Sequence, residues 1–544
     1  MQELSNSQFL QLLRQHNIEI HATDERLQIS APAGAVDPQL RAELVRRKAD
    51  LLAALRDADA HSSQISPVAT ERDKKIPQTY AQQGLWIIDH FEPGNATYNI
   101  PEAFLMNVPV CMEALQKAVD ALLVRHESLR TYFYEEDGDL LQAVSPEART
   151  QVGFTDLSAL EETKRDPTLN TLIREHARRP FELHRPPLVR FHVFRLDKQR
   201  HVIFFNIHHI IADRRSLQIL HEELDVLYQA AVSSETVRLP DLPIQYPDYA
   251  LWSAKHMDSA AIEKQIQYWK KKLAGVPAFL ELPCSRPYPA ERTASGAIVP
   301  VTIPASLRDD LRKLGQEEGA SLFMTLLAAF AVLLHRHSGS EDFCIGSPFT
   351  HRKQVETESI IGLFLNMLAF RCELAGNQSF RECLRVIRNT ALDAYENSDV
   401  PFQKLVRTLK PDLRSRRSPL FQIMFGFDST ADPQSSKVVQ GDTYLGTARY
   451  DLTLELGNGP NGILGSFEYC TDLFEETSIV QLAEQFLSVL NEVVRRPNGP
   501  ISSISISSCA RRKQDEIPDF PITKKSEGPI KKLARWLSLR TGRN

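Results

Sequence analysis

Two adjacent histidines are the residues of this chain whose type and spacing could do chemistry. His208 and His209 close an apolar run, and Asp213 follows the second histidine by four residues. In a regular strand, successive side chains point to opposite faces, so alternation groups His209 with Phe205 and Ile207 and turns His208 away. The two imidazoles therefore cannot both face one metal ion, and no third ligand follows at a recognisable spacing. The pattern argues against a zinc site.

A single neutral imidazole held at the end of a strand suits acyl transfer from a thioester. An amine or alcohol reacts weakly while it keeps its proton, and a base that removes the proton contributes about 10²–10⁴ in rate. No GxSxG elbow or reactive-cysteine signature calls for a covalent enzyme intermediate. By themselves the residues still favour a packed structural pair. Asp213 could cap the helix that begins around Arg215, or pair with a distant cation.

Residues 76 to about 508 must supply the elements that hold these histidines. Strand-like and helix-like runs alternate irregularly here, which predicts an α/β fold too large for one core and therefore two lobes. We expect strands at Leu188–Phe194, Val202–Ile207 and Ile298–Ile303, and helices at Cys111–His126, Arg215–Val232 and Ser321–His335.

The first 60 residues form a separate small α/β unit. Ser5 or Ser7 can cap a short helix, two alternating runs at 18–20 and 27–29 indicate a hairpin, and Asp37-Pro38 starts a second helix that runs to about Asp57. The polar segment 61–75 is interpreted as a linker. An accessory cap on the main fold is the alternative to an independent unit.

The composition excludes several classes of protein. With 64 Lys and Arg against 69 Asp and Glu, the net charge of -5 gives no reason to expect nucleic acid as a partner. The seven scattered cysteines contain no CxxC pair and fit reduced thiols. The start of the chain lacks the features of a signal peptide, and the apolar stretch Leu322–Leu334 is too short to cross a bilayer. We expect a cytoplasmic protein with no membrane partner.

The last segment, residues 510–544, has ten Lys and Arg against four Asp and Glu. Ile530, Leu533 and Leu537 recur at helical spacing beside basic residues, which describes a basic amphipathic helix. A solvated tail and a contact for an acidic carrier protein both remain open.

Seven collinear segments resemble the condensation domains of nonribosomal peptide synthetases, relatives of chloramphenicol acetyltransferase. The resemblance covers residues 76 to about 508, and the histidine segment is its third motif. The segments are Thr79–Trp86, Arg125–Phe133, His208–Arg214, Tyr246–Trp252, Ile361–Asn366, Asp399–Val406 and Ser418–Phe425.

This resemblance implies a V-shaped pair of lobes, at 76–250 and 251–509, with a tunnel between them. A carrier protein would present an acyl chain on phosphopantetheine from one side while the acceptor enters from the other, and no cofactor would be bound. By motif position His209 is the active-site histidine and His208 supports it. Asp213 is structural and forms an ion pair with an arginine, for which Arg352 is the candidate. Arg130 would do similar structural work.

Two residues of the third motif need separate interpretation. Arg214 stands where the family has glycine, and it could face solvent or the wall, bind an acceptor carboxylate, or mark a degraded site. Ser216 matches a serine often found after the motif. It is a second candidate for substrate binding, although packing or helix capping explains it equally well.

The N-terminal unit is similar to the docking domains of megasynthase subunits, in which a β-hairpin lies between helices. Such domains pair a segment of the preceding enzyme against the hairpin edge, so the resemblance implies an upstream carrier protein as partner. The sequence shows no adenylation or carrier motif, so we expect a free-standing enzyme that receives both substrates in trans. Its acceptor would be a small molecule or a second carrier protein. Similarity to enacyloxin-type chain-releasing enzymes favours ester formation, with amide formation close behind. An epimerisation domain and a non-catalytic recruitment domain are the alternatives.

Overall fold

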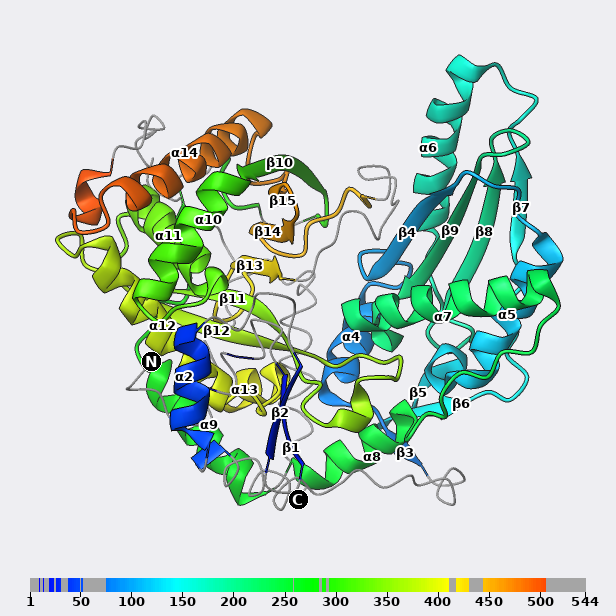
Figure 1. Cartoon of the computed structure of the whole chain (residues 1–544), viewed down its shortest axis with the longest axis horizontal. Helices are drawn as coiled ribbons and strands as arrows, with labels where there is room; N and C mark the ends of the chain where they lie inside the picture. Colours follow the sequence, from blue (N-terminus) through cyan, green and yellow to red (C-terminus); the bar gives the residue numbers. More distant parts are fainter. Residues whose placement is uncertain are drawn as a thin grey trace, which may run out of the picture.

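The computed structural model describes Phe9, Leu13 and residues 19–23, 26–30, 38–48, 50–51, 75–257, 259–282, 286–289, 293–409, 417–429 and 444–504. Within these ranges the chain forms two lobes that stand side by side as a V, with a small head beside the larger lobe (Figure 1). The α/β fold class is confirmed. The expected linker at 61–75, apart from Lys75, and the basic tail lie outside the described residues, as do Ser5 and Ser7.

The N-terminal lobe is built on a four-stranded sheet in which β9 is central and fully buried. Its order is β4-β9-β8-β7, antiparallel except for the parallel β7–β8 pair, and a second sheet has the order β3-β6-β5. The strands are β3 (Ile76–Pro77), β4 (Asn99–Met106), β5 (Thr131–Glu136), β6 (Asp139–Val144), β7 (Gly153–Asp156), β8 (Val189–Arg195) and β9 (His201–His208). The helices are α4 (Tyr80–Phe91), α5 (Met112–Arg125), η2 (Glu127–Arg130), α6 (Glu162–Arg178), η3 (His209–Ile211) and α7 (Arg214–Ser233).

The C-terminal lobe has a mixed six-stranded sheet of order β10-β15-β14-β13-β11-β12. Its strands are β10 (Gly296–Pro304), β11 (Asp342–Thr350), β12 (Leu365–Glu373), β13 (Ile423–Asp428), β14 (Leu452–Gly459) and β15 (Gly462–Cys470). Its helices are α9 (Ala260–Lys272), α10 (Ala305–Glu317), α11 (Leu322–Ser338), η4 (Val355–Thr357), α12 (Phe380–Glu396), α13 (Phe402–Leu409), α14 (Glu476–Arg495) and η5 (Ile501–Ser503).

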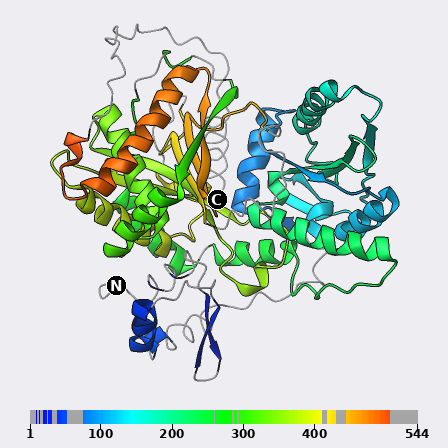
Figure 2. The ribbon, with the colours of Figure 1, turned by 45° about the horizontal axis from the view of Figure 1, so that its top comes forward.

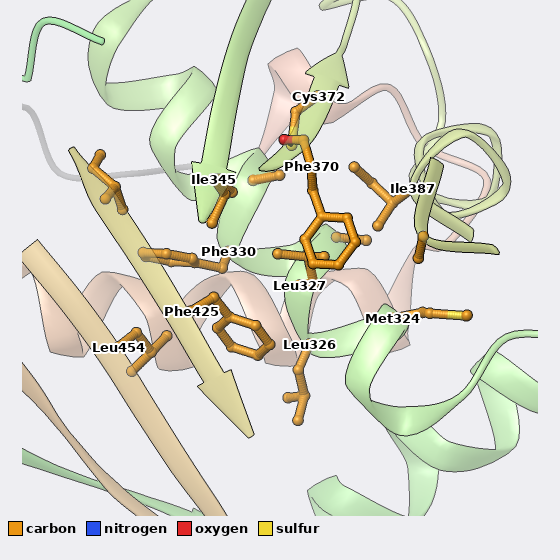
Figure 3. Packing of buried hydrophobic residues seen from close by; sticks show 14 of the residues in the cluster. Met324, Leu326, Leu327, Phe330, Ile345, Phe370, Cys372, Ile387, Phe425 and Leu454 are labelled. Carbon is orange, nitrogen blue, oxygen red and sulfur yellow. Dashed lines mark hydrogen bonds between the residues drawn. The ribbon is translucent and has the colours of Figure 1, made fainter. Parts of the chain in front are cut away.

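Helix α11 is the centre of the larger lobe, as the unbroken apolar run in its sequence predicts. Phe330 is fully buried and its ring lies 5.9 Å from that of Phe425 on β13 (Figure 3). Among the described residues no single helix is long and apolar enough to cross a membrane. The α10–α11 pair satisfies that test only jointly, across a bend of 100°.

A single helix, α8 (Tyr246–His256), connects the two lobes at the base of the V (Figure 1). The lobe boundary expected between residues 250 and 251 therefore falls inside a helix. Tyr246 and Tyr249 pack in one buried cluster with Phe364, a residue of the larger lobe. Because the helix is buried against both lobes, it works as a joint and not as a loose linker.

The head contains the expected hairpin and a helix that begins at the expected proline. Strands β1 (Glu19–Thr23) and β2 (Arg26–Ser30) are antiparallel, and helix α2 spans Pro38–Arg46 (Figure 2). The buried apolar side chains of the head belong to the same cluster as the core of the larger lobe; they are Phe9, Leu13, Ile20, Leu44 and Leu51. The head therefore has apolar contact with the main fold.

Candidate active site

His209 lies where the buried strand β9 ends. The strand runs between β4 and β8 and stops at His208, and His209 opens the short helix η3. The alternation expected along the strand therefore does not reach His209, because the backbone turns one residue earlier. The His209 amide donates to the Tyr98 carbonyl (2.8 Å), which anchors the turn to the loop before β4.

The ring of His209 is held in one orientation by a backbone carbonyl. Its Nδ1 lies 2.7 Å from the Ala212 carbonyl oxygen, which can only accept, so Nδ1 carries the proton and Nε2 keeps its lone pair. Burial and the positive charge of Arg449 lower the pKa of His209 to about 4, against the opposing effects of the Ala212 carbonyl and Asp213. At neutral pH the imidazole is an uncharged proton acceptor.

His208 supports the same turn from within the lobe. It is 2 % exposed, and its Nδ1 accepts a hydrogen bond from the Ile210 amide (3.1 Å). Burial lowers its pKa to about 3, with smaller contributions from His209 and Arg449. A neutral, buried ring that caps η3 shapes the backbone on which His209 is carried.

Asp213 and Arg352 form a buried ion pair between the lobes. Their side chains are 5 % and 2 % exposed, and Arg352 Nη2 donates to Asp213 Oδ1 (3.0 Å). Asp213 is the N-cap of α7, where it accepts from the Ser216 amide (2.8 Å), and its Oδ2 accepts from the Phe364 amide (3.1 Å). Arg352 also donates to the Ile360 carbonyl (2.9 Å) and lies over the Phe364 ring, 4.1 Å from its centre.

Ser216 belongs to this buried network and not to a substrate surface. Ser216 is 1 % exposed, and its Oγ lies 2.7 Å from Asp213 Oδ1 and 2.8 Å from the Gly362 carbonyl oxygen. It also accepts from Arg352 Nη2 (2.9 Å) and the Gly362 amide (3.0 Å). Of the two roles that the sequence left open, the structure favours packing and helix capping over substrate contact, since no face of the hydroxyl is left to solvent.

The network fastens a loop of the larger lobe, residues 351–364, to the smaller one. Gly362 passes so close to α8 that a Cβ there would lie 1.9 Å from Tyr246 Cδ2. Tyr246 Oη donates to the Leu363 carbonyl (2.8 Å), and Ser128 Oγ donates to the Ile361 carbonyl (2.8 Å). Segments that are far apart in the sequence thus converge on this one loop.

Arg130 does its structural work elsewhere. It donates to the Leu123 carbonyl (2.6 Å) at the end of α5 and to the Ser145 carbonyl (2.9 Å) after β6. These contacts close the end of α5, whose last carbonyls have no partner within the helix. Support from Arg130 to the histidine segment is therefore indirect, unlike that from Arg352.

Arg214 keeps an ordinary backbone and makes a contact across the lobes. It is the first residue of α7, a position open to any side chain, so the missing glycine leaves the turn intact. Its Nε forms an ion pair with Asp428, the last residue of β13, while 72 % of its side chain stays exposed. An acceptor carboxylate would share the guanidinium with Asp428, because the contact with Asp428 uses Nε and most of the side chain stays exposed.

Sequence reasoning missed Arg449 and Asp428, which reach the site from the larger lobe. Arg449 Nη2 donates to the Thr97 carbonyl (3.0 Å), and its guanidinium lies 4.5 Å from the centre of the Tyr98 ring. The available signal was weak: an arginine three residues before the alternating run that forms β14. The fold brings Arg449 to the turn at the end of β9, which is more than 200 residues away in the sequence.

Two family models match most of the chain. Residues 72–514 match the condensation domain family, and residues 7–57 match the TubC N-terminal docking domain. The chain belongs to the condensation domain family found in nonribosomal peptide synthetases. Its head is a docking domain of the TubC type, as the hairpin between helices predicts.

The chain matches part of much longer curated relatives. It is 40% identical over 453 residues to one of the linear gramicidin synthase proteins of Brevibacillus parabrevis, covering 82% of this chain and 6% of that protein. It is 34% identical over 445 residues to phosphinothricin tripeptide synthetase PhsC of Streptomyces viridochromogenes, covering 81% and 41%. It thus spans less than half the length of either.

Solved structures share the fold at low identity. The X-domain from teicoplanin biosynthesis superposes with a TM-score of 0.72 at 23% identity, covering 81% of this chain and all of that one. The first condensation domain of the calcium-dependent antibiotic synthetase, bound to a substrate analogue, gives 0.68 at 19% and covers 80% and 100%. Both share the α/β fold of this chain.

Removal of Arg352 should damage the fold as a whole. Arg352→Ala should lower the free energy of unfolding by about 3–5 kcal/mol, because it leaves the Asp213 carboxylate buried without its counterion. Ser216→Ala keeps the ion pair and should cost about 1–3 kcal/mol. Urea denaturation followed by fluorescence measures both. A loss for Arg352→Ala no larger than that for Ser216→Ala would contradict this account.

The Arg214–Asp428 pair should contribute little to stability, because its arginine is exposed. Arg214→Gly should change the free energy of unfolding by about 1 kcal/mol or less. We expect its condensation rate to fall by the same factor for a carboxylate-bearing acceptor and for the matching amide. A selective loss with the carboxylate would instead show that Arg214 binds the acceptor carboxylate.

Proposed function

We propose that this chain transfers an acyl, peptidyl or polyketide chain from a carrier-protein phosphopantetheine thioester to an amine or hydroxyl acceptor. The observation that carries the proposal is the His209 ring, whose Nδ1 proton is committed to the Ala212 carbonyl and whose Nε2 is therefore a proton acceptor. His209 acts as the general base, His208 shapes its turn, and the Asp213–Arg352 pair supports it. Amide or ester bonds are the products.

The chemistry needs one proton shuttle and no covalent enzyme intermediate. As the acceptor nitrogen or oxygen bonds to the thioester carbonyl carbon, its proton passes to His209 Nε2. The tetrahedral species then collapses, the carbon–sulfur bond breaks, and the proton leaves on the phosphopantetheine thiol. Phosphopantetheine is thus part of the substrate, and the protein needs no cofactor of its own for these steps.

The position of His209 at the lobe junction supports this role. Residues of the larger lobe meet the smaller lobe at Asp213, Arg214 and, through Arg449, the turn beside Tyr98. His209 therefore lies between the two lobes, which would bring the donor and the acceptor together. The same geometry would serve a free acceptor or one bound to a second carrier protein.

The docking head and the cysteines support the remaining parts of the proposal. We infer that the β1–β2 hairpin binds a segment of an upstream, carrier-bearing enzyme by strand addition.

Five cysteines in the described ranges are unpaired, and four of these are buried. Free thiols of this kind fit the cytoplasm, where we place the protein.

A recruitment role is the second candidate, since an X-domain of this fold is known in complex with OxyB from teicoplanin biosynthesis. The ordered His209 ring favours the catalytic function. Mixing a loaded carrier protein and a nucleophile with the enzyme separates the two, because only a catalyst forms the product. Epimerisation of the carrier-bound residue, read by chiral analysis, would indicate the third class.

Loss of the base should abolish condensation without loss of the fold. His209→Ala should lower the rate by about 10²–10⁴, the usual contribution of general-base catalysis. His208→Ala should keep much of the rate and instead lose about 1–3 kcal/mol of stability, since the Ile210 amide loses its buried acceptor. Product formation by mass spectrometry and thermal melts measure the two effects. Survival of more than about a tenth of the rate in His209→Ala excludes His209 as the base.

Deletion of residues 1–60 should impair carrier recognition and spare the chemistry. Activity with small-molecule thioester donors should stay, while the carrier concentration for half-maximal rate rises, because docking raises the effective concentration of the donor. A carrier from an unrelated pathway is the control and should show no such shift. Equal rates with and without the head at low carrier concentration would refute the docking role.

A further inference from the structure

A short segment of the larger lobe crosses to the smaller lobe beside the active site. We call residues 444–449 the cross-lobe strap. Leu445 is buried in a cluster of the smaller lobe that also contains Ala103 of β4 and Phe204 of β9. Arg178, at the end of α6, donates through Nε to the Leu445 carbonyl (2.9 Å). The start of the strap is thereby fixed to the smaller lobe.

The strap turns at a glycine where it passes the end of α6. Gly446 has a positive φ of 72°, and a Cβ there would lie 2.6 Å from Arg178 Nη2. The Ala448 amide then donates to the Ala294 carbonyl of the larger lobe (2.8 Å). The Gly446 carbonyl accepts from the Gly296 amide (2.9 Å), so the middle of the strap is bonded to the larger lobe, while Leu445 and Arg449 reach the smaller one.

Arg449 makes the reciprocal contact at the other end. Arg178 of the smaller lobe donates to a strap carbonyl, and Arg449 of the strap donates to the Thr97 carbonyl of the smaller lobe (3.0 Å). The next residue, Tyr98, lies under the Arg449 guanidinium and accepts the His209 amide (2.8 Å). One unbroken series of contacts thus runs from the strap to the backbone of His209.

We propose that Arg449 is a positioning residue that holds the Thr97–Tyr98 turn, and with it His209, in the reactive arrangement only while the two lobes are closed. The proposal rests on the general-base function of His209. If the lobes part, the strap moves the Arg449 guanidinium away from the Thr97–Tyr98 turn. The Tyr98 carbonyl, which accepts the His209 amide, is then no longer held in place. Closure around the substrates and orientation of the base become one event.

The charge of Arg449 adds a consequence that can be measured. Charged or titratable groups facing His209 are Arg449 from the strap, Asp213 from the N-terminus of α7, and His208 from the end of β9. Asp213 favours the imidazolium, whereas Arg449 disfavours it, so removal of Arg449 raises the pKa of His209 from about 4 towards its ordinary value of 6.5. A base with a higher pKa becomes protonated at a higher pH. The fall of the pH–rate profile on its acid side, its acid limb, therefore moves to higher pH.

The test compares Arg449→Gln, Arg449→Lys and the control Arg178→Gln in the full chain. Arg449→Gln should lower kcat by about 10- to 100-fold, the scale of a misplaced catalytic group, and should move the acid limb upwards. Arg449→Lys keeps the charge, so its acid limb should stay in place while kcat falls, since an ammonium lacks the planar fork. Arg178→Gln loosens the strap away from the histidine and should lower kcat less, without moving the acid limb.

An NMR titration of His209 in the resting enzyme, assigned by comparison with His209→Ala, makes the result independent of turnover. A raised pKa in Arg449→Gln, unchanged in Arg449→Lys and Arg178→Gln, supports the proposal. An unchanged pKa in Arg449→Gln together with unaltered kcat in Arg449→Lys overturns it, as does an equal kcat loss in Arg178→Gln. Full activity of His209→Ala would instead refute the proposed function and leave this titration interpretable. If Arg449→Gln does not fold, kcat of Arg449→Lys relative to Arg178→Gln decides.

Discussion

The arrangement of this protein depends on one buried ion pair, between Asp213 and Arg352. Two charges removed from water carry a desolvation penalty of several kcal/mol each, which their mutual attraction offsets only when further hydrogen bonds complete both groups. Asp213 meets that condition with the amides of Ser216 and Phe364, and Arg352 does so with the Ile360 carbonyl and the Phe364 ring. Because Arg352 lies on a loop of the larger lobe and Asp213 lies in the smaller lobe, the pair fixes that loop against the smaller lobe.

This constraint extends directly to the chemistry, because Asp213 stands four residues after His209. The Asp213 carboxylate caps the first turn of α7. The carbonyl of Ala212, the residue before it, accepts the hydrogen bond from His209 Nδ1 (2.7 Å). An error in the placement of Asp213 would therefore rotate the imidazole. The pair supports the base mainly through the backbone, and the charge of Asp213 adds a smaller effect that favours the imidazolium. His209 Nδ1 bonds to the Ala212 carbonyl and not to a carboxylate, unlike the histidine of a catalytic triad.

Much of this could be predicted from the sequence, and what could not has a physical reason. Hydrophobic periodicity located β9, α7 and α11, and the family resemblance paired Arg352 with Asp213. Both kinds of signal can be recognised along the sequence without knowledge of the fold. The predicted strand Val202–Ile207 ends within one residue of β9, but the turn that begins at His209 was not predicted, since it depends on the backbone carbonyls of Tyr98 and Ala212. For Ser216 the sequence left substrate contact and helix capping equally open, since a hydroxyl that completes an ion pair looks the same in sequence as one that contacts a ligand.

The electrostatic balance at His209 also explains why its base need not be strong at rest. With a pKa of about 4 the ring stays unprotonated, yet a weaker base offers less driving force for proton removal. In the proposed reaction, attack on the thioester carbonyl would create an oxyanion, whose negative charge would oppose that of Arg449 and favour the imidazolium. Proton affinity therefore rises when the tetrahedral species forms and falls again when the thiolate leaves. In the proposed mechanism, a histidine kept neutral by burial and by a cation from the opposite lobe would accept the acceptor's proton in the transition state and pass it to the leaving thiolate, without a long-lived charged intermediate.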